Sequence, residues 1–212
     1  MLQLSNTLVA DSNPNSHVSE SFRSLRTYIK QSGMLQDGGK SLLFTSGEAG
    51  EGKTTVMANL AVSFVQDGKK VAVVDCNLRK PALHTVFGVE NSPGLADCLS
   101  GQKEPGKVTV YGNLANLTIV TAGNSIGSPP DLLGNSVMTE LLEELKATHD
   151  LVLLDAPPAV PYSDARVLAP LTDGVIIIAR YGKSKRELLR KVKALMEQAG
   201  TPILGIAINQ AK

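Results

Sequence analysis

A glycine-rich segment, Gly47 to Thr54, constrains the fold of this 212-residue chain more than any other part of the sequence. It reads Gly-Glu-Ala-Gly-Glu-Gly-Lys-Thr and matches the pattern G-x-x-x-x-G-K-[ST]. The apolar run 40–46 before it predicts a buried strand, and residues 54–66 after it predict a helix with an apolar face. A strand, a tight glycine turn and a helix in this order predict a phosphate-binding loop, in which backbone N–H groups and the positive helix end surround phosphates.

The residues of this loop predict how a nucleotide would be held. Lys53 can reach the β- and γ-phosphates, and the hydroxyl of Thr54 can ligate Mg²⁺. A glycine turn without a ligand is the alternative, and the flanking strand and helix argue against it. The predicted nucleotide contacts are Gly47, Gly50, Glu51, Gly52, Lys53, Thr54 and Thr55.

Two more apolar runs end in a carboxylate. Residues 70–75 end at Asp75, and residues 150–155 end at Asp155. Ligands of open parallel sheets sit at the carboxyl ends of the strands, so both side chains are expected beside the phosphate loop. A lone Asp at such a position is usually a turn residue, but two of them in a chain with a phosphate loop favour a magnesium site.

Predicted strands and helices alternate along the chain, which implies an α/β fold. We expect a doubly wound, mostly parallel sheet in the three-layer α/β/α arrangement of P-loop NTPases. Residues 1–16, rich in Ser and Asn, are expected to form a flexible extended arm, followed by one domain over 17–212. The further strands are expected at 117–122, 174–180 and 203–209, and the further helices at 17–31, 130–148, 164–171 and 183–199.

Composition limits the functions that this chain can have. A net charge of +1 gives no general attraction to DNA or anionic membranes, so no nucleic-acid partner is expected. Cys76 and Cys98 form no C-x-x-C motif, which argues against zinc and a disulfide framework and favours a reduced cytoplasmic setting. No apolar run reaches the roughly 18 residues of a bilayer span, and the first 15 residues lack the pattern of a signal peptide.

A basic segment near the carboxyl end stands apart from this near-neutral composition. It begins with Lys183-Ser184-Lys185-Arg186 and continues with Arg190, Lys191 and Lys193 on a predicted helix. Such a helix is most often a solvated face, and an anionic partner is the functional alternative.

Taken together, these motifs resemble the bacterial tyrosine kinase family, the capsule and exopolysaccharide autokinases of the CpsD/CapB type. The resemblance extends from about His17 to Asn209, nearly the whole chain. The segments that carry it are an E-x-x-R-x-x-R helix at 20–26, the phosphate loop at 46–55, a D-x-D-x-R-x-P-like acidic motif at 73–81, a further acidic motif at 153–158, and the closing segments 163–165 and 204–209.

The resemblance implies MgATP-dependent transfer of a phosphoryl group to tyrosine, with Lys53, Asp75 and Asp155 as catalytic residues. Asp75 would help to position the metal and accept the tyrosine proton, while Asp155 would hold the metal through water. The implied Mg²⁺ ligands are Thr54, Asp75, Asn77 and Asp155. Asn209 is implied at the adenine edge, with capping of a strand end as its alternative. Arg79 and Lys80 are candidates for charge stabilisation or, equally, for salt bridges at a helix start.

The resemblance also implies partners. Glu20, Arg23 and Arg26 share one helix face, and in the family this helix docks onto a neighbouring subunit to build a ring. An exposed set of intrahelical ion pairs is the alternative. Protein tyrosines as substrates and a separate membrane adaptor are implied as well. We therefore expect a cytoplasmic homo-oligomer, held peripherally at the inner face of the membrane by that adaptor.

Two departures from the family pattern leave the function open. Asn77 stands where the family has a second Asp, and it is a poor general base. The chain ends at Lys212 without a tyrosine cluster, since its tyrosines lie apart at positions 28, 111, 162 and 181. Either the chain is truncated, or phosphate goes to a different protein, or the activity is reduced to ATP binding.

Three hypotheses follow from these observations. The first is a tyrosine kinase, and the second is a regulatory ATP-binding switch that controls assembly and polysaccharide export. The third is a partitioning ATPase of the ParA/MinD kind, acting on DNA or membrane. Those ATPases have a signature lysine where this chain has Glu48, and a carboxylate cannot stabilise a neighbour's γ-phosphate. Glu48 and the low net charge therefore disfavour the third hypothesis.

Overall fold

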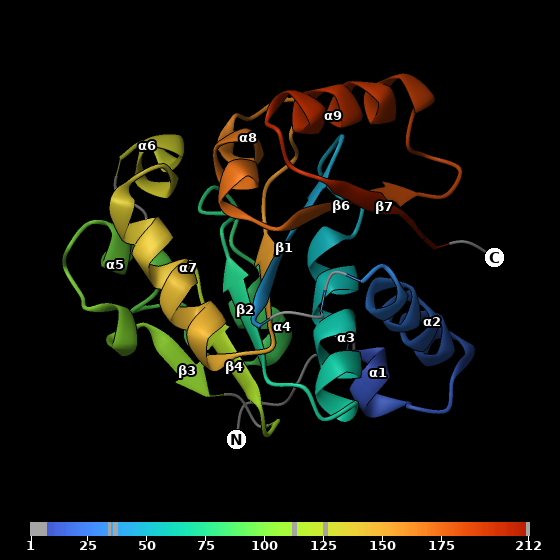
Figure 1. The fold of residues 1–212 in the computed structure, drawn as a ribbon, viewed down its shortest axis with the longest axis horizontal. Helices are drawn as coiled ribbons and strands as arrows, with labels where there is room; N and C mark the ends of the chain where they lie inside the picture. Colours follow the sequence, from blue (N-terminus) through green and yellow to red (C-terminus); the bar gives the residue numbers. More distant parts are fainter. Residues whose placement is uncertain (1–7, 34, 36–37, 112–113, 125–126, 211–212) are drawn as a thin grey trace.

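The computed structural model describes residues 8–33, 35, 38–111, 114–124 and 127–210. Within these residues a seven-stranded sheet has the order β3-β4-β2-β5-β1-β6-β7 (Figure 1). Every neighbouring pair is parallel except β3 with β4. The strands are β1 (Lys40–Ser46), β2 (Val71–Asp75), β3 (Thr109–Tyr111), β4 (Leu117–Val120), β5 (Leu151–Asp155), β6 (Gly174–Arg180) and β7 (Ile203–Asn209).

Helices cover both faces of this sheet. One cluster of buried apolar side chains lies between the sheet and α1 (Val9–Ser12), α2 (His17–Gln31), α3 (Lys53–Gln66) and α4 (Leu83–Phe87). A second cluster lies between the other face and α5 (Leu95–Leu99), α6 (Pro129–Leu133), α7 (Ser136–Thr148), α8 (Asp164–Leu168) and α9 (Arg186–Gln198). The predicted three-layer, doubly wound and mostly parallel α/β fold is confirmed.

Local capping explains where several helices begin and end. The side chain of Ser16 accepts a hydrogen bond from the Ser19 amide, and α2 starts directly after it, as predicted. The prediction of a single helix over 130–148 is wrong, because this segment forms two helices, α6 and α7. Gly134 ends α6, and Asn135 caps α7 by accepting a hydrogen bond from the Met138 amide.

Besides α1, which is described below, the sequence does not predict the short elements β3, α4 and α5. Each has five residues or fewer, so too few side chains repeat to give a helical or strand periodicity. β3 adds an antiparallel edge strand to an otherwise parallel sheet. The strands β1, β2 and β5 and the helix α3 are among the elements that the sequence predicts, whereas α4, whose first residue Leu83 donates to Asp75 at the end of β2, is not.

The described part of the predicted arm, residues 8–16, is packed against the domain and is not extended. Leu8 and Ala10 are buried, and the Ala10 amide donates a hydrogen bond of 2.9 Å to Asn59 Oδ1 on α3. This apolar contact stabilises the short helix α1 where the polar sequence predicts none. Residues 1–7 of the arm lie outside the described residues, and the domain boundary at residue 17 remains a prediction.

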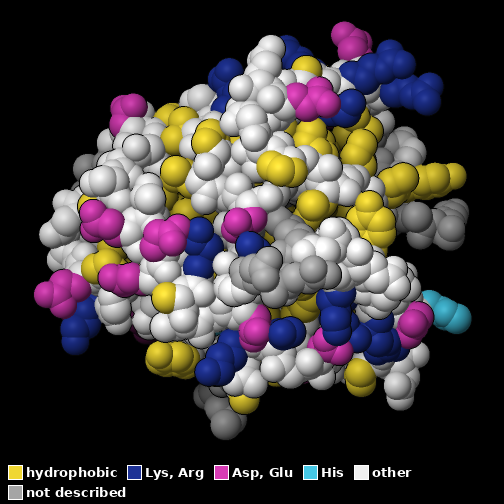
Figure 2. All heavy atoms as spheres, in the orientation of Figure 1, with side chains coloured by type: hydrophobic (Ala, Val, Ile, Leu, Met, Phe, Trp, Pro, Cys, Tyr) yellow, Lys and Arg dark blue, Asp and Glu magenta, His cyan; other side chains and the backbone are white. Residues whose placement is uncertain are grey.

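The surface shows an uneven distribution of side chains. Figure 2 shows Lys and Arg side chains gathered over α9, at the upper right, with hydrophobic side chains exposed beside them. In the part of the chain that the structure describes, no helix is both long and apolar enough to cross a bilayer.

Candidate active site

The phosphate loop joins β1 to α3, and its glycines fit positions that other residues would strain. Gly50 and Gly52 have φ angles of +79° and +91°, in the left-handed region that favours glycine. A Cβ atom on Gly52 would lie 2.0 Å from Asn209 Nδ2, so β7 also leaves no room for a side chain. Helix α3 begins at Lys53 with no side-chain cap from Gly52, which leaves its first N–H groups available to an anion.

Lys53 lies at the base of this loop. Its side chain is buried, and Nζ donates a hydrogen bond of 3.1 Å to Ser46 Oγ. Burial lowers the pKa of Lys53, and the carboxylates of Asp155 and Glu51 offset part of that effect. An ammonium group in such surroundings interacts more strongly with a phosphate than it would in water.

Asp75 and Asp155 lie next to each other at the predicted end of the sheet. They are register partners on β2 and β5, and both side chains are fully buried. Burial, with a further contribution from the Asp75 carboxylate, raises the pKa of Asp155 to about 7. Burial also raises the pKa of Asp75. Two neighbouring carboxylates of this kind favour either a shared proton or a bound cation.

The contacts of Asp155 fit a magnesium site. Its Oδ2 accepts a hydrogen bond from the Thr54 hydroxyl, while its Oδ1 is buried and has no partner among the described residues. A buried oxygen without a partner is uncommon and calls for one. The described residues contain no cluster of three or more His, Cys, Asp or Glu suited to a metal. Mg²⁺ does not need such a cluster, because it usually combines one or two carboxylates with phosphate and water oxygens.

Asp75 is held more firmly than Asp155. Its Oδ1 accepts a hydrogen bond of 3.1 Å from the Asn77 amide, and its Oδ2 accepts bonds of 2.9 and 3.0 Å from the amides of Ala82 and Leu83. The predicted metal ligand Asn77 also has a local role, since its Oδ1 accepts a hydrogen bond of 3.2 Å from the Lys80 amide. Asp75 therefore fixes the segment after β2 in addition to any role toward a metal.

Glu51 braces the phosphate loop with its side chain. Its Oε2 accepts a hydrogen bond of 3.0 Å from the Glu48 amide, and its Oε1 accepts one from the hydroxyl of Ser184. Asn209 Nδ2 donates a bond of 3.0 Å to the Glu51 carbonyl. Two segments far from the loop in the sequence, at Ser184 and at Asn209, thus meet at one loop residue. The sequence does not predict a role for Ser184 at the site, because a single serine in a basic segment carries no recognisable pattern.

The remaining predicted loop residues lie in the same region. Gly47 lies against α9, where an added Cβ would be 3.2 Å from the Cβ of Leu188. Thr55 is half-buried in the first turn of α3. The structure therefore brings Gly47 to Thr55, Asp75, Asp155 and Asn209 together around the loop.

Comparison with known proteins agrees with this geometry. Residues 42–212 match the CobQ/CobB/MinD/ParA nucleotide binding domain. Tyrosine-protein kinase YwqD of Bacillus subtilis (strain 168) is 35% identical over 210 residues, which cover 99% of this chain and 88% of that protein. The kinase domain of Escherichia coli tyrosine kinase ETK superimposes with a TM-score of 0.92 at 30% identity, over 99% of this chain and 81% of that one.

The chain belongs to the bacterial tyrosine-protein kinase family. By homology it is a protein-tyrosine kinase with a nucleotide-binding domain, and the predicted resemblance is confirmed. The chimerical protein CapA2B2 also superimposes with a TM-score of 0.92, at 28% identity, over 99% of this chain and 92% of that one.

In this tyrosine kinase, Arg79 forms an ion pair with an acidic residue at the start of helix α8. Its guanidinium donates to both carboxylate oxygens of Asp164, the first residue of α8, over 3.1 to 3.2 Å. It also lies over the ring of Tyr162, 4.4 Å from the centroid. The contact matches the salt-bridge alternative for Arg79 and links the segment after β2 to the segment after β5. The side chain of Lys80 is exposed.

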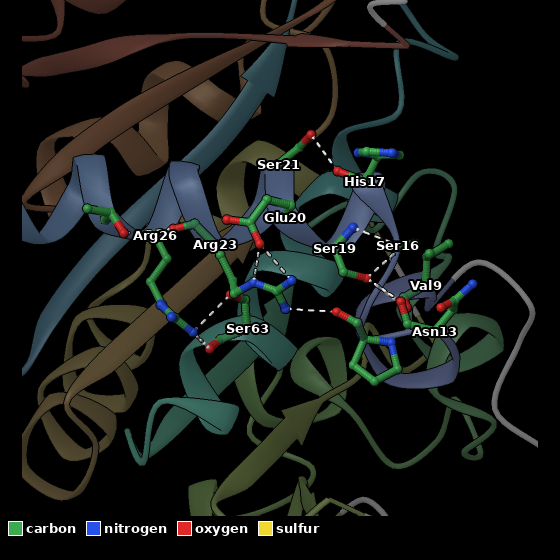
Figure 3. Close-up of polar contacts among 12 residues, drawn as sticks. Val9, Asn13, Ser16, His17, Ser19, Glu20, Ser21, Arg23, Arg26 and Ser63 are labelled. Carbon is green, nitrogen blue, oxygen red and sulfur yellow. Dashed lines mark hydrogen bonds and ion pairs between the residues drawn. The ribbon is translucent and has the colours of Figure 1, made fainter.

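The face of α2 predicted for assembly is divided in two. Figure 3 shows Arg23 directed at Glu20, to which its Nε donates a hydrogen bond of 2.7 Å. Its Nη1 also donates a hydrogen bond of 2.8 Å to the carbonyl of Pro14. Arg26 points the other way, toward Ser63 on α3, and its Nη1 lies 3.2 Å from Ser63 Oγ. The exposed part of this face in a single chain is therefore Glu20 and Arg23, while Arg26 holds α2 against α3.

Proposed function

We propose that this chain transfers the γ-phosphoryl group of MgATP to tyrosine hydroxyls of proteins, and that this transfer regulates capsular or exopolysaccharide synthesis. The observation that carries the proposal is the placement of Asp75 and Asp155 in register beside Lys53 and Thr54. Family membership supports tyrosine as the acceptor.

The residues present fit each requirement of this reaction. Lys53 and the N–H groups at the start of α3 would hold the β- and γ-phosphates and stabilise charge that develops on them. Thr54 and Asp155 would hold Mg²⁺, directly or through water. When bound, this cation would neutralise charge on the phosphate oxygens.

Asp75 would accept the proton of the tyrosine hydroxyl. Free tyrosine has a pKa near 10, so a positioned base assists its attack. Burial raises the pKa of Asp75 by more than its three amide donors lower it, and this makes the carboxylate a better base than an exposed Asp. Its tether to Ala82 and Leu83 would keep it oriented.

We also propose the partners that the family resemblance implies. Glu20 and Arg23 would contact a second copy in a ring, with Arg26 positioning the helix. Protein tyrosines would be the substrates, and a membrane adaptor would hold the chain at the cytoplasmic side. Asn209 would contact adenine while its amide braces Glu51.

Phosphorylation of a tyrosine-containing acidic copolymer tests the proposed reaction. Wild type and Lys53→Met are incubated with MgATP, with and without a candidate adaptor. Loss of the Lys53 charge beside the transferred group should reduce phosphotyrosine formation by on the order of a hundredfold or more. Lys107→Met, at an exposed lysine remote in sequence, is the matched control and should retain activity. Undiminished phosphorylation by Lys53→Met would show that the site is assigned wrongly. Nucleotide binding without any phosphotyrosine would favour the regulatory switch.

A further inference from the structure

The basic segment around α9 has no role in the proposed reaction. Residues 180–198 contain seven Lys or Arg and two Glu, whereas the whole chain has a net charge of only +1. The segment is thus strongly positive and the rest of the chain is negative overall. Among the described residues, no acidic side chain forms an ion pair with Lys183, Lys185, Arg186 or Arg190. A near-neutral total charge therefore conceals a positive surface.

Exposed aliphatic side chains lie on the same side of the sheet as this basic segment. Ile206 and Ile208 pair with Ile177 and Ala179 of β6, and Ile177 packs in the cluster that α9 covers. Their side chains are 47% and 60% exposed, on a strand at the edge of the sheet. Exposed apolar patches with a polar rim mark surfaces that contact another protein or a membrane.

One basic side chain, Lys193, and one exposed aliphatic side chain, Ile206, border a hollow between α9 and β7, where Lys193 forms an ion pair of 3.2 Å with Glu197. A cavity of about 610 Å³ between α9 and β7 is lined by Lys193, Glu197 and Ile206, among others. Arg186 and Arg190 precede Lys193 by seven and three residues, so the three side chains follow one stripe of α9. Figure 2 shows the blue side chains of this region next to exposed yellow ones.

We propose that this surface binds the headgroup region of an anionic phospholipid bilayer. The surface, called here the α9–β7 face, consists of Lys183, Lys185, Arg186, Arg190, Ile206 and Ile208. Lys and Arg would contact lipid phosphates, and the two isoleucines would enter the boundary between headgroups and acyl chains. An acidic peptide or a nucleic acid would use the charges but would have no need of the isoleucines, and for this reason we favour the bilayer.

This binding would act beside the nucleotide site without depending on kinase activity. Leu188 of α9 lies against Gly47 of the phosphate loop, and Ser184 contacts Glu51. A bilayer on the α9–β7 face would hold the chain with this side toward the membrane. It would add a direct lipid contact to the adaptor proposed above, and its failure would leave the proposed kinase reaction untouched.

Sedimentation with vesicles tests the proposal. The full chain is mixed with phosphatidylcholine vesicles, and with vesicles in which part of the lipid is phosphatidylglycerol, at low and high salt. We expect binding only to the anionic vesicles, weakened by salt. Arg186→Glu with Arg190→Glu should weaken binding by about twentyfold or more, since each lost basic contact accounts for about fivefold. Ile206→Ser with Ile208→Ser should weaken it several-fold.

A matched control and a folding check keep the result interpretable. Lys103→Glu with Lys107→Glu makes the same charge change at exposed positions outside this face and should bind nearly as wild type. Thermal melting and nucleotide affinity establish that each variant is folded. Equal binding to both vesicle types, or equal loss in the control, would overturn the proposal. If the arginine variant loses vesicle binding and the isoleucine variant does not, the proposal is also overturned. That result would indicate an anionic polymer as the ligand, and binding assays with an acidic peptide and with DNA would then identify which one.

Discussion

Asp75 and Asp155 lie opposite each other on neighbouring parallel strands, fully buried, in the same register. Two ionised carboxylates repel each other there, because little solvent screens their charges. The phosphate loop adds Lys53 and Thr54 to the pair. This is the pair of carboxylates at which we propose that Mg²⁺ and the phosphates of the nucleotide are held.

The first prediction concerns stability against pH without nucleotide or metal. The pKa of Asp155 is about 7 in the folded chain and lies near its ordinary 3.8 when exposed. The folded state therefore holds this proton more tightly, and stability should fall as pH rises from about 4 to about 7. Urea unfolding at several pH values measures this slope. Asp155→Asn has no titratable group at this position, so its free energy of unfolding should fall less over this pH range. The difference from wild type should be a few kcal/mol at most. Equal slopes for both proteins would contradict the buried pair as described.

The second prediction concerns Asn77 and the metal. Asn77→Asp adds a negative charge near the expected cation and keeps an oxygen for the Lys80 amide. The Mg²⁺ concentration for half-maximal phosphorylation should stay the same or fall. Asn77→Ala, which removes that oxygen, serves as the comparison and should need as much Mg²⁺ or more. A higher Mg²⁺ requirement in Asn77→Asp would contradict the placement of the metal.

The third prediction concerns the brace of the phosphate loop. Ser184→Ala removes the hydroxyl that contacts Glu51, and Glu51→Ala also removes the acceptor of the Glu48 amide. Each lost hydrogen bond is worth about 1 kcal/mol, so nucleotide affinity should fall several-fold in Ser184→Ala and further in Glu51→Ala. Titration calorimetry with ADP measures both. Thr172→Ala provides a control, because it removes a hydroxyl whose hydrogen bond, to the Ala169 carbonyl, lies far from the loop in the sequence. Unchanged affinity in Glu51→Ala would show that the brace is irrelevant to binding.

The fourth prediction separates assembly from folding on α2. Glu20→Ala with Arg23→Ala removes an exposed pair worth only a few tenths of a kcal/mol within the chain, so the variant should stay folded and form a smaller species. Arg26→Ala should instead lower the free energy of unfolding by about 1–3 kcal/mol, because Ser63 loses its partner. Light scattering and urea unfolding at matched concentration distinguish the two effects. Identical masses for wild type and the double variant would refute the assembly role.

The sequence predicts those parts of the site that local patterns specify. The phosphate loop has a fixed spacing, and Asp75 and Asp155 follow apolar runs of strand length, so all three could be located without a structure. The contact of Ser184 with Glu51 spans 133 positions and follows no pattern. The contact of Arg26 with Ser63 could not be predicted either. The helix period shows only that Arg26 shares a face with Glu20 and Arg23. Packing of α2 against α3 then directs the Arg26 side chain toward Ser63.

The fold likewise has elements that local sequence patterns predict and elements that they do not. The long elements α2, β6 and β7 begin and end where the sequence predicts, because their apolar side chains repeat over several turns or pleats. The break at Gly134 was missed, since the apolar pattern continues through α6 and α7 on both sides of it.

The most direct test of the central claim is the fate of the transferred phosphoryl group. The full chain is incubated with ATP labelled at the γ-phosphate, Mg²⁺ and a tyrosine-containing acceptor, and label is measured in phosphotyrosine and in free phosphate. We predict label on tyrosine that requires Mg²⁺ and is lost in Lys53→Met. Label found only in free phosphate, with none on tyrosine under any of these conditions, would contradict it.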